Sequence, residues 1–297
     1  MSLLTERSRL ITRGPLWAIT PEGFGGLMAN LFQQMAEVTR FMALKPTTIG
    51  KPTNKLSVIP VQGVLTKDAP WAGTTYGSIS DAVEDAAADP SVKRIVLAVD
   101  SPGGEVTGLP ETAAMIASAA KVKPVSAHVD GTAASAAYWL ASQSSDITLS
   151  PSSEVGSVGV RMMHADISKM MDDAGIKITE LHAGQYKTEW TPFAPLSDDA
   201  KAHMQGRLND AHADFLKAVA EGRGARASAG IRKARYGEGR MFTAPEAMGH
   251  GLADKVLSSR EFYRAIQSTE ELPASRTANL STIRARIELE KIRGLFP

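Results

Sequence analysis

The strongest constraint on this fold is an alternation of apolar runs and helical patterns between residues 56 and 150. The runs LSVIPVQGVLT, VKRIVLAVD, PVSAHVD and DITLS predict buried strands, and they are separated by SISDAVEDAAADP, residues 105–120 and residues 133–142, which predict helices. Strands that alternate with helices favour a parallel sheet covered by helices. We therefore expect an α/β fold.

The alternation is expected to continue beyond residue 150. HADISKMMDDAG predicts a helix and IKITELHAG the strand after it, and a long helix follows with Ser197 as its N-cap. TAPEAMGHGLADKVLS then predicts a short Thr-capped helix, a glycine turn and a last strand.

Two amphipathic patterns flank this region, at residues 27–42 and 281–296, and LKPTTIGKPTNK (44–55) is typical of a linker. We predict three parts: an N-terminal helical segment and linker (1–55), a main domain (56–258) and a C-terminal helical tail (259–297). The apolar stripes of the flanking helices need a partner to bury them, so we also expect a homo-oligomer.

Composition excludes several function classes. Lysine and arginine (33) balance aspartate and glutamate (32) in the 297 residues, so no net field favours nucleic acid or an anionic membrane. Cysteine is absent, which removes disulfides, thiolate nucleophiles and cysteine-based zinc sites. We find no secretion signal and no apolar run long enough for a membrane span. We expect a soluble cytoplasmic protein without a metal or cofactor.

VDGTAASAAYWLAS (129–142) places a single serine, Ser135, in a run of alanines at an expected loop-to-helix junction. Two interpretations remain open at this point: the small residues serve tight packing, or Ser135 is presented as a nucleophile. A second loop follows the expected strand VKRIVLAVD, at DSPGG (100–104). Its glycines and the start of the next helix would suit an oxyanion hole, but they also fit an ordinary turn. Both loops fall at the carboxyl ends of strands, where α/β sheets bind ligands.

A serine nucleophile needs a base. The chain has six histidines, at positions 128, 164, 182, 203, 212 and 250, and none lies in a distinctive motif; His203 and His212 are expected on the surface and His128 and His182 within strands. A lysine kept neutral by burial is the other base used with serine. Lys187 lies among Tyr186, Trp190 and Phe193, although a solvated surface lysine fits that position as well.

Four ordered motifs, DSPGG, GTAASAAYWLAS, VGSVGV (155–160) and AGQYK, together resemble the signal peptide peptidase A family of serine peptidases. That family includes the head-maturation proteases of tailed phages, such as protein C of the lambdoid phages. The resemblance covers residues 56–258. It implies a crotonase-like fold, shared with the Clp protease subunit and built of repeated ββα layers, and a Ser–Lys dyad.

Carried over by position, the resemblance implies that Ser135 is the nucleophile, that Lys187 is the general base and that Ser157 hydrogen-bonds the lysine. Gly103 and Gly104 match the oxyanion loop, and the N–H of Ala136 is the natural second donor. Ala136 and Ala137 stand where many members have two glycines, which alters the shape of the substrate pocket.

Membrane-bound members carry an N-terminal anchor, where this chain has an amphipathic helix and a Pro/Thr linker, so we expect the phage-type branch. Its substrates would be scaffold, capsid or portal proteins, with any scaffold a separate protein, and its location the host cytoplasm or the prohead interior. The alternatives are a bacterial signal-peptide-peptidase-like protease, a crotonase-type acyl-CoA enzyme using Glu105 or Glu111, and an inactive structural head protein.

Overall fold

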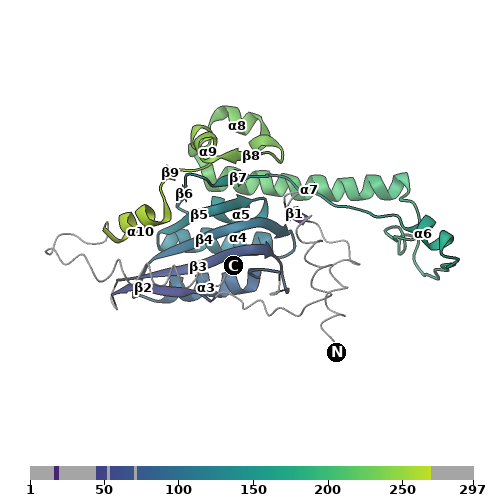
Figure 1. Cartoon of the computed structure of the whole chain (residues 1–297), viewed down its shortest axis with the longest axis horizontal. Coiled ribbons are helices and arrows are strands. Elements are labelled where there is room, and N and C mark those ends of the chain that lie inside the picture. Colours follow the sequence, from purple (N-terminus) through teal and green to yellow (C-terminus); the bar gives the residue numbers. More distant parts are fainter. Residues whose placement is uncertain (1–16, 20–44, 52–53, 70–71, 269–297) are drawn as a thin grey trace.

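The computed structural model describes residues 17–19, 45–51, 54–69 and 72–268. These residues form one nine-stranded mixed sheet, whose main path runs in the order β2-β3-β4-β5-β6-β9 (Figure 1). The strands are β1 (Trp17–Ile19), β2 (Thr47–Lys51), β3 (Asn54–Leu65), β4 (Val92–Glu105), β5 (Val125–Ala134), β6 (Asp146–Leu149), β7 (Glu154–Gly156), β8 (Met241–Thr243) and β9 (Lys255–Val256). From β3 to β9 every neighbour on the path is parallel, and β2 pairs antiparallel with β3.

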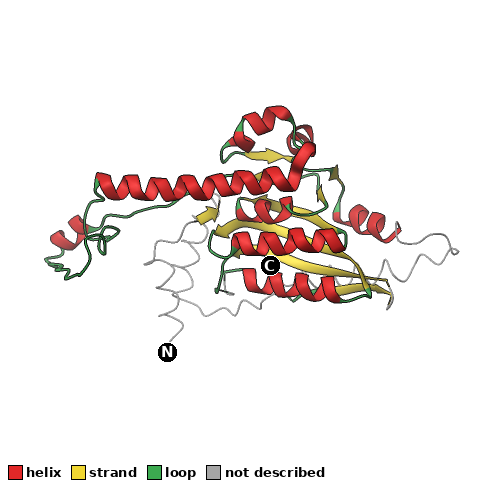
Figure 2. Cartoon of the chain, turned by 180° about the vertical axis from the view of Figure 1, so that it is seen from behind, coloured by secondary structure: helices red, strands yellow, loops and turns green. Residues whose placement is uncertain are grey.

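Three helices cover one face of the sheet: α3 (Tyr76–Ala88), α4 (Leu109–Val122) and α5 (Ala136–Ser142) (Figure 2). α3 begins where the Thr75 side chain accepts a hydrogen bond from the Ser78 amide, and it ends at Asp89, directly before Pro90. α4 begins after Gly108, with a proline in its first turn. The strand–helix alternation of the sequence is thus confirmed as an α/β fold.

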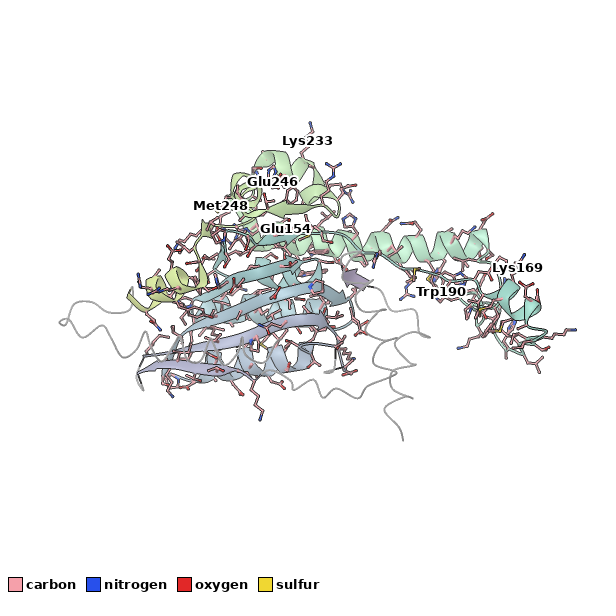
Figure 3. All side chains as sticks on the ribbon, in the orientation of Figure 1. Glu154, Lys169, Trp190, Lys233, Glu246 and Met248 are labelled. Atoms are coloured by element: carbon pink, nitrogen blue, oxygen red, sulfur yellow. The ribbon has the colours of Figure 1, made fainter. Side chains whose placement is uncertain are left out.

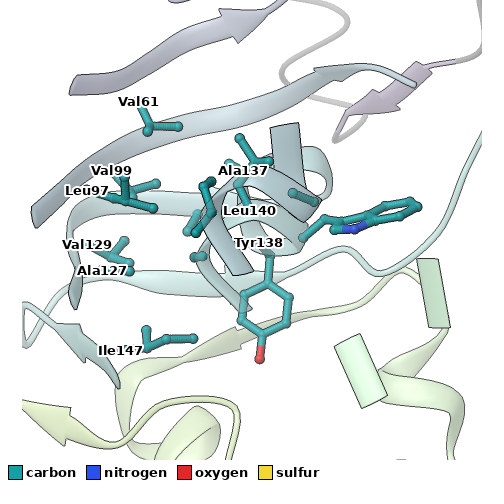
Figure 4. Close-up of a cluster of buried hydrophobic side chains, with 14 of the residues drawn as sticks. Val61, Leu97, Val99, Ala127, Val129, Ala137, Tyr138, Leu140 and Ile147 are labelled. Carbon is teal, nitrogen blue, oxygen red and sulfur yellow. The ribbon is translucent and has the colours of Figure 1, made fainter. Parts of the chain in front are cut away.

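The main core lies between this face and the helices. Figure 4 shows Val61, Val99 and Val129 of the strands facing Ala137 and Leu140 of α5. All seven residues of α5 are buried, so this helix packs on every side rather than on one stripe. Ala136 and Ala137 in its first turn allow this close packing, and Tyr138, Trp139 and Leu140 fill the space further along.

The opposite face carries α10 (Ser259–Ser268). Its Phe262, Tyr263 and Ile266 pack on Leu56 and Val58 of β3 and on Val96 of β4. Residues of a strand point alternately to its two faces, so β3 and β4 supply both cores. The sheet is therefore covered on both sides at its centre.

α7 (Asp198–Arg223) spans 26 residues, about 39 Å at 1.5 Å per residue. Ser197 is its N-cap and accepts a hydrogen bond from the Ala200 amide at 3.1 Å, as predicted. Only its last half, from Ala211 to Arg223, packs on the sheet domain. The first half projects outward with residues 161–197, which include α6 (Ser168–Asp173), and we call residues 161–210 the arm (Figures 1 and 2).

A small cap follows α7, made of the 3-10 turns Gly224–Arg226 and Arg235–Gly237, α8 (Ala229–Lys233), β8 and α9 (Ala244–His250). Thr243 and Glu246 form a capping box at the start of α9, and Gly251 ends it with a φ of 72°. The predicted Thr-capped helix, glycine turn and strand are confirmed.

Three local predictions are wrong. β4 does not end at Asp100 but runs through Pro-Gly-Gly to Glu105, because β3 pairs with it as far as Leu65. Residues 176–184 form no strand and are exposed, because no neighbouring strand is available there to pair with them. Residues 47–51, expected in a linker, form the edge strand β2.

The expected helices at 27–42 and 281–296 lie outside the described residues. The domain boundaries at 55 and 258 stay a proposal, with β2 and α10 contacting the sheet from beyond them. Within the described ranges, none of the helices combines the length and the apolar character needed to cross a membrane.

Candidate active site

Ser135 occupies a strained turn between β5 and α5. Its φ of 53° and ψ of −120° lie in a region that non-glycine residues rarely adopt, and strain of this kind collects at functional sites. The Ser135 amide donates to the Gly156 carbonyl at 2.8 Å, which holds the turn. Its hydroxyl makes no capping bond to α5, and it lies 3.5 Å from the carbonyl oxygen of Gly159, a long hydrogen bond. The side chain is thus held in place without being used for helix capping.

The packing interpretation of the alanine run is confirmed by the structure. Ala133, Ala134, Ala136 and Ala137 have no exposed surface, and neither has Ser135. The small residues allow α5 to enter the core, and the same packing fixes the serine. Trp139 stacks on Phe215 of α7 with ring centroids 4.7 Å apart, which fastens the helix from the other side.

Ser157 lies in a second strained turn beside the first. β7 pairs with the end of β5, with Ala134 opposite Gly156, and Ser157 follows with a φ of 53°. Its amide donates to the Arg240 carbonyl at 2.8 Å. Gly156 has a φ of 132°, and a Cβ there would meet the Arg240 oxygen at 2.5 Å, so only glycine fits. The structure therefore brings Ser135 and Ser157 to one edge.

Gly103 and Gly104 lie within a strand rather than in a loop. Ser101 pairs with Ala133, so the end of β4 runs beside the end of β5 and close to Ser135. The Gly103 amide donates to the Ser101 hydroxyl at 3.1 Å. A Cβ on Gly104 would lie 1.7 Å from the Leu65 carbonyl oxygen, so this glycine allows β3 and β4 to approach. Ala136 opens α5, where a helix leaves its first amides free of intrahelical partners.

Lys187 is not brought to Ser135 within one chain. It lies in exposed turns of the arm, and within the described part of the chain no hydrogen bond joins it to Ser135 or Ser157. Figure 3 places Trp190, three residues further on, beside the outer half of α7. The burial expected for this lysine is therefore absent from the single chain.

The arm is unusually apolar for an exposed segment. α6 has no buried residue, and Leu181 is 94% exposed. The exposed large apolar side chains of the arm are Met163, Met170, Ile176, Ile178, Leu181 and Tyr186. Exposed apolar groups gathered on one segment mark an interaction surface.

The histidines lie apart from Ser135, with one exception that the sequence did not suggest. His212 on α7 is half-buried beside the main chain of Val158, in the loop that carries Gly159. Burial and the nearby Arg235 lower its pKa, against the opposing effects of Glu238 and of Val158. Its contact with the 157–160 loop comes from tertiary packing and has no sequence signal.

His128 is buried within β5, where its Nε2 lies 3.0 Å from the Ser259 hydroxyl and its ring stacks on Phe262. Burial lowers its pKa to about 4. His164 and His182 are on the arm, and the exposed His182, expected in a strand, lies in coil. His203 is exposed on α7 and His250 ends α9.

Two carboxylates near β4 support the fold by accepting main-chain hydrogen bonds. Glu105 is buried and accepts a hydrogen bond from the Lys67 amide at 2.8 Å, and burial raises its pKa. Asp100 accepts from the Thr132 amide at 3.0 Å, and burial likewise raises its pKa. Glu111 is in the exposed first turn of α4. The described residues hold no cluster of acidic and histidine side chains suited to a metal ion.

Comparison with known proteins gives relatives that share this region. The capsid assembly protease C of Escherichia phage lambda is 29% identical over 75% of this chain. A Methanocaldococcus jannaschii protein named as a candidate protease is 34% identical over 72% of the chain. The match spans 51% of the phage protein and 66% of the archaeal one, so this chain covers only part of each relative.

A solved structure of an enoyl-CoA hydratase/isomerase family member covers 84% of the chain with a TM-score of 0.46 and 16% identity, and it says nothing of the chemistry. The sequence match to a family is direct. Residues 117–272, more than half of the chain, match peptidase family S49, and they include the motifs GTAASAAYWLAS, VGSVGV and AGQYK. The chain therefore belongs to peptidase family S49.

Proposed function

We propose that this protein is a serine endopeptidase with Ser135 as its nucleophile. The observation that carries the proposal is the turn at Ser135, where a positive φ and a buried alanine shell fix a hydroxyl that caps no helix. Membership of peptidase family S49 supports the same chemistry. Strain at Ser135 has a plain use if its hydroxyl must be aimed at a substrate.

The oxyanion donors of this proposal are the Ala136 amide and the main chain of Gly103 and Gly104. The Ala136 amide lies next to the nucleophile at the N-terminus of α5, where free amides favour negative charge. The Gly103 amide is bonded to Ser101, so it serves only after that bond is exchanged. Ser157, in the neighbouring turn, is proposed to position the base.

The proposed base, Lys187, comes from a second copy of the chain. Within one chain Lys187 is exposed on an arm that projects beyond the sheet, and the arm carries a surface of exposed apolar side chains. Docking of this arm on another copy would bury those side chains and would also desolvate the lysine. Desolvation favours the neutral amine that a general base requires.

The proposed reaction has two stages, acylation of Ser135 and hydrolysis of the acyl-enzyme. Lys187 takes the hydroxyl proton while the Ser135 oxygen bonds to the peptide carbonyl carbon, and the amides hold the resulting oxyanion. The C–N bond breaks and the proton passes from the lysine to the leaving amine, which leaves an acyl-enzyme. Water, deprotonated by the same lysine, bonds to the acyl carbon, the ester bond to the Ser135 oxygen breaks, and the lysine returns its proton to that oxygen as the acid leaves.

A role in capsid maturation is the proposed biological setting. It is supported by the similarity to a phage protein named as a capsid assembly protease, and it would make scaffold, capsid or portal proteins the substrates. Such a protease would work in the host cytoplasm or in the prohead. An acyl-CoA enzyme is disfavoured because Glu105 is committed to Lys67 and Glu111 faces solvent.

The test is labelling with a fluorophosphonate followed by peptide mass mapping. We expect the label on Ser135, and we expect Ser135→Ala to lose both the label and the cleavage of candidate head proteins. Ser142→Ala is the matched control, because it removes a hydroxyl from the other end of α5, where the group bonds the Trp139 carbonyl. Cleavage by Ser135→Ala at the parent rate would refute the proposal.

A further inference from the structure

β5 does not pair with the last residues of β4, next to Ser135. β3 pairs along one side of β4 up to Leu65 opposite Gly104. β5 pairs along the other side only up to Ala133 opposite Ser101, because β5 ends at Ala134 and the chain turns away at Ser135. On this side, the main chain of Gly103 to Glu105 is therefore available to another strand, directly beyond the candidate nucleophile.

The chain itself fills this edge. β1 pairs antiparallel with β4, with Trp17 opposite Glu105, Ala18 opposite Gly104 and Ile19 opposite Gly103 (Figure 1). Among the described strands β4 is its only partner. Three residues held by one neighbour form a weak strand, and more than twenty residues separate it from β2, so the fold does not force it to stay there.

We propose that residues 17–19 are an internal peptide occupying the substrate's place on β4. Addition of an extended segment to an open strand edge is a general mode of peptide recognition, and it uses main-chain hydrogen bonds that any sequence offers. A substrate peptide placed to meet Ser135 and the Gly103–Gly104 main chain would need the edge that β1 holds. The inference rests on the proposed function, because it takes Ser135 as the reacting group.

The burial of Ser135 agrees with a closed state. The serine has no exposed surface, so a substrate reaches it only after some segment has moved. Among the described strands, β1 is held by β4 alone, at Gly103 to Glu105 just beyond the end of β5. The occupied form is then a resting state, and displacement of β1 by a substrate or by assembly opens the site.

The test uses two single variants of the full chain, Ala18→Pro and Ile19→Pro. Amides of neighbouring residues in a strand point to opposite edges, so one of these positions donates toward β4 and the other away from it. Proline removes the amide hydrogen, so one variant breaks the pairing and the other serves as its matched control.

Both variants are made in a Ser135→Ala background, and a fluorescein-labelled peptide with the sequence of residues 13–22 is the probe. We expect the pairing variant to bind this peptide at least tenfold more tightly than the parent does. Hydrogen exchange at the amides of residues 103–105 should rise in the same variant and fall again when the peptide is added. Equal, weak binding by both variants and unchanged exchange would overturn the inference.

The same substitutions in the active chain separate this idea from the proposed function. If β1 occupies the site, fluorophosphonate labels Ser135 several-fold faster in the pairing variant than in its control. If no variant is labelled while the peptide still binds, the proposed chemistry fails and the occupancy of β4 stands. If labelling is equally fast in all three chains, the serine is reactive and the inhibitory role of β1 is refuted.

Discussion

The sheet domain around α5 and the arm differ in how deeply their side chains are buried. Every residue of α5 is buried. α6 of the arm has no buried residue, and the outer half of α7 projects from the sheet. The candidate nucleophile belongs to the first region and the candidate base to the second. In the site we propose, one chain builds the Ser135 half rigidly and a second copy contributes the half that carries Lys187.

The largest effect expected from this contrast is on activity. Lys187→Arg should lower kcat/KM by at least about 10³-fold, because arginine keeps the charge but cannot act as a base. Thermal unfolding of its separated single chains should match the parent's, since within one chain the side chain is exposed. Peptide hydrolysis and a melting curve on the same preparation provide the check.

His212→Gln is the companion variant, because His212 contacts the loop beside Ser135. It should keep most of the activity. Loss of activity in His212→Gln together with its retention in Lys187→Arg would move the base to the histidine.

The second contrast compares two arginines of α7. Arg223 is buried and donates to both carboxylate oxygens of Asp254, at 2.9 and 2.8 Å, and to the Gly251 carbonyl. Arg223→Ala leaves Asp254 without this partner and should cost about 3–5 kcal/mol of unfolding free energy. Arg207→Ala, on the exposed arm, should stay within about 0.5 kcal/mol. Urea unfolding of both variants tests this difference, and equal losses of unfolding free energy would contradict it.

Substitutions at two glycines of α7 should change the free energy of unfolding by smaller amounts, and in opposite directions. A Cβ on Gly222 would lie 2.2 Å from the Ser142 carbonyl oxygen at the end of α5, whereas Gly206 has open space around it. Gly222→Ala should therefore destabilise by about 1–3 kcal/mol. Gly206→Ala should stabilise by up to about 1 kcal/mol, because alanine is the better helix former. Thermal melts that moved in the same direction would contradict the packing described for α7.

The smallest effect is the acid dependence of stability. Burial alone would raise the pKa of Asp254, but hydrogen bonding to Arg223, the charge of that arginine and the Ile147 amide together lower it. A folded pKa below the unfolded one stabilises the protein above the unfolded value of about 4, and this contribution is lost as the pH falls through the folded pKa. The stability gap between the parent and Arg223→Ala should narrow below pH 4. A gap that is constant with pH would show that Asp254 does not titrate with folding.

The sequence predicted local features well where a residue's own neighbours decide them. The N-cap at Ser197 and the helix after Thr243 follow from side chains a few residues away. β2 was missed because its pairing with β3 is a tertiary contact in a Pro- and Thr-rich segment. The expected strand at 176–184 has β-branched residues but no partner, so propensity alone misled.

The candidate site divides in the same way. Ser135 stands out in the sequence because small residues surround it, and the structure gives the packing reason. The spatial separation of Lys187 could not be read from the sequence, because a 26-residue helix decides how far the arm extends. The contact of His212 with the 157–160 loop and the place of β1 on β4 also come only from the folded chain.

The central claim, that Ser135 and Lys187 meet across two copies, is tested most directly by complementation. Ser135→Ala and Lys187→Ala are co-expressed with different tags, and mixed oligomers are isolated on both tags in turn. Random mixing gives about a quarter of the sites an intact serine from one copy and an intact lysine from another, so about a quarter of the parent activity should return. Mixed oligomers as inactive as either variant alone would contradict a shared site.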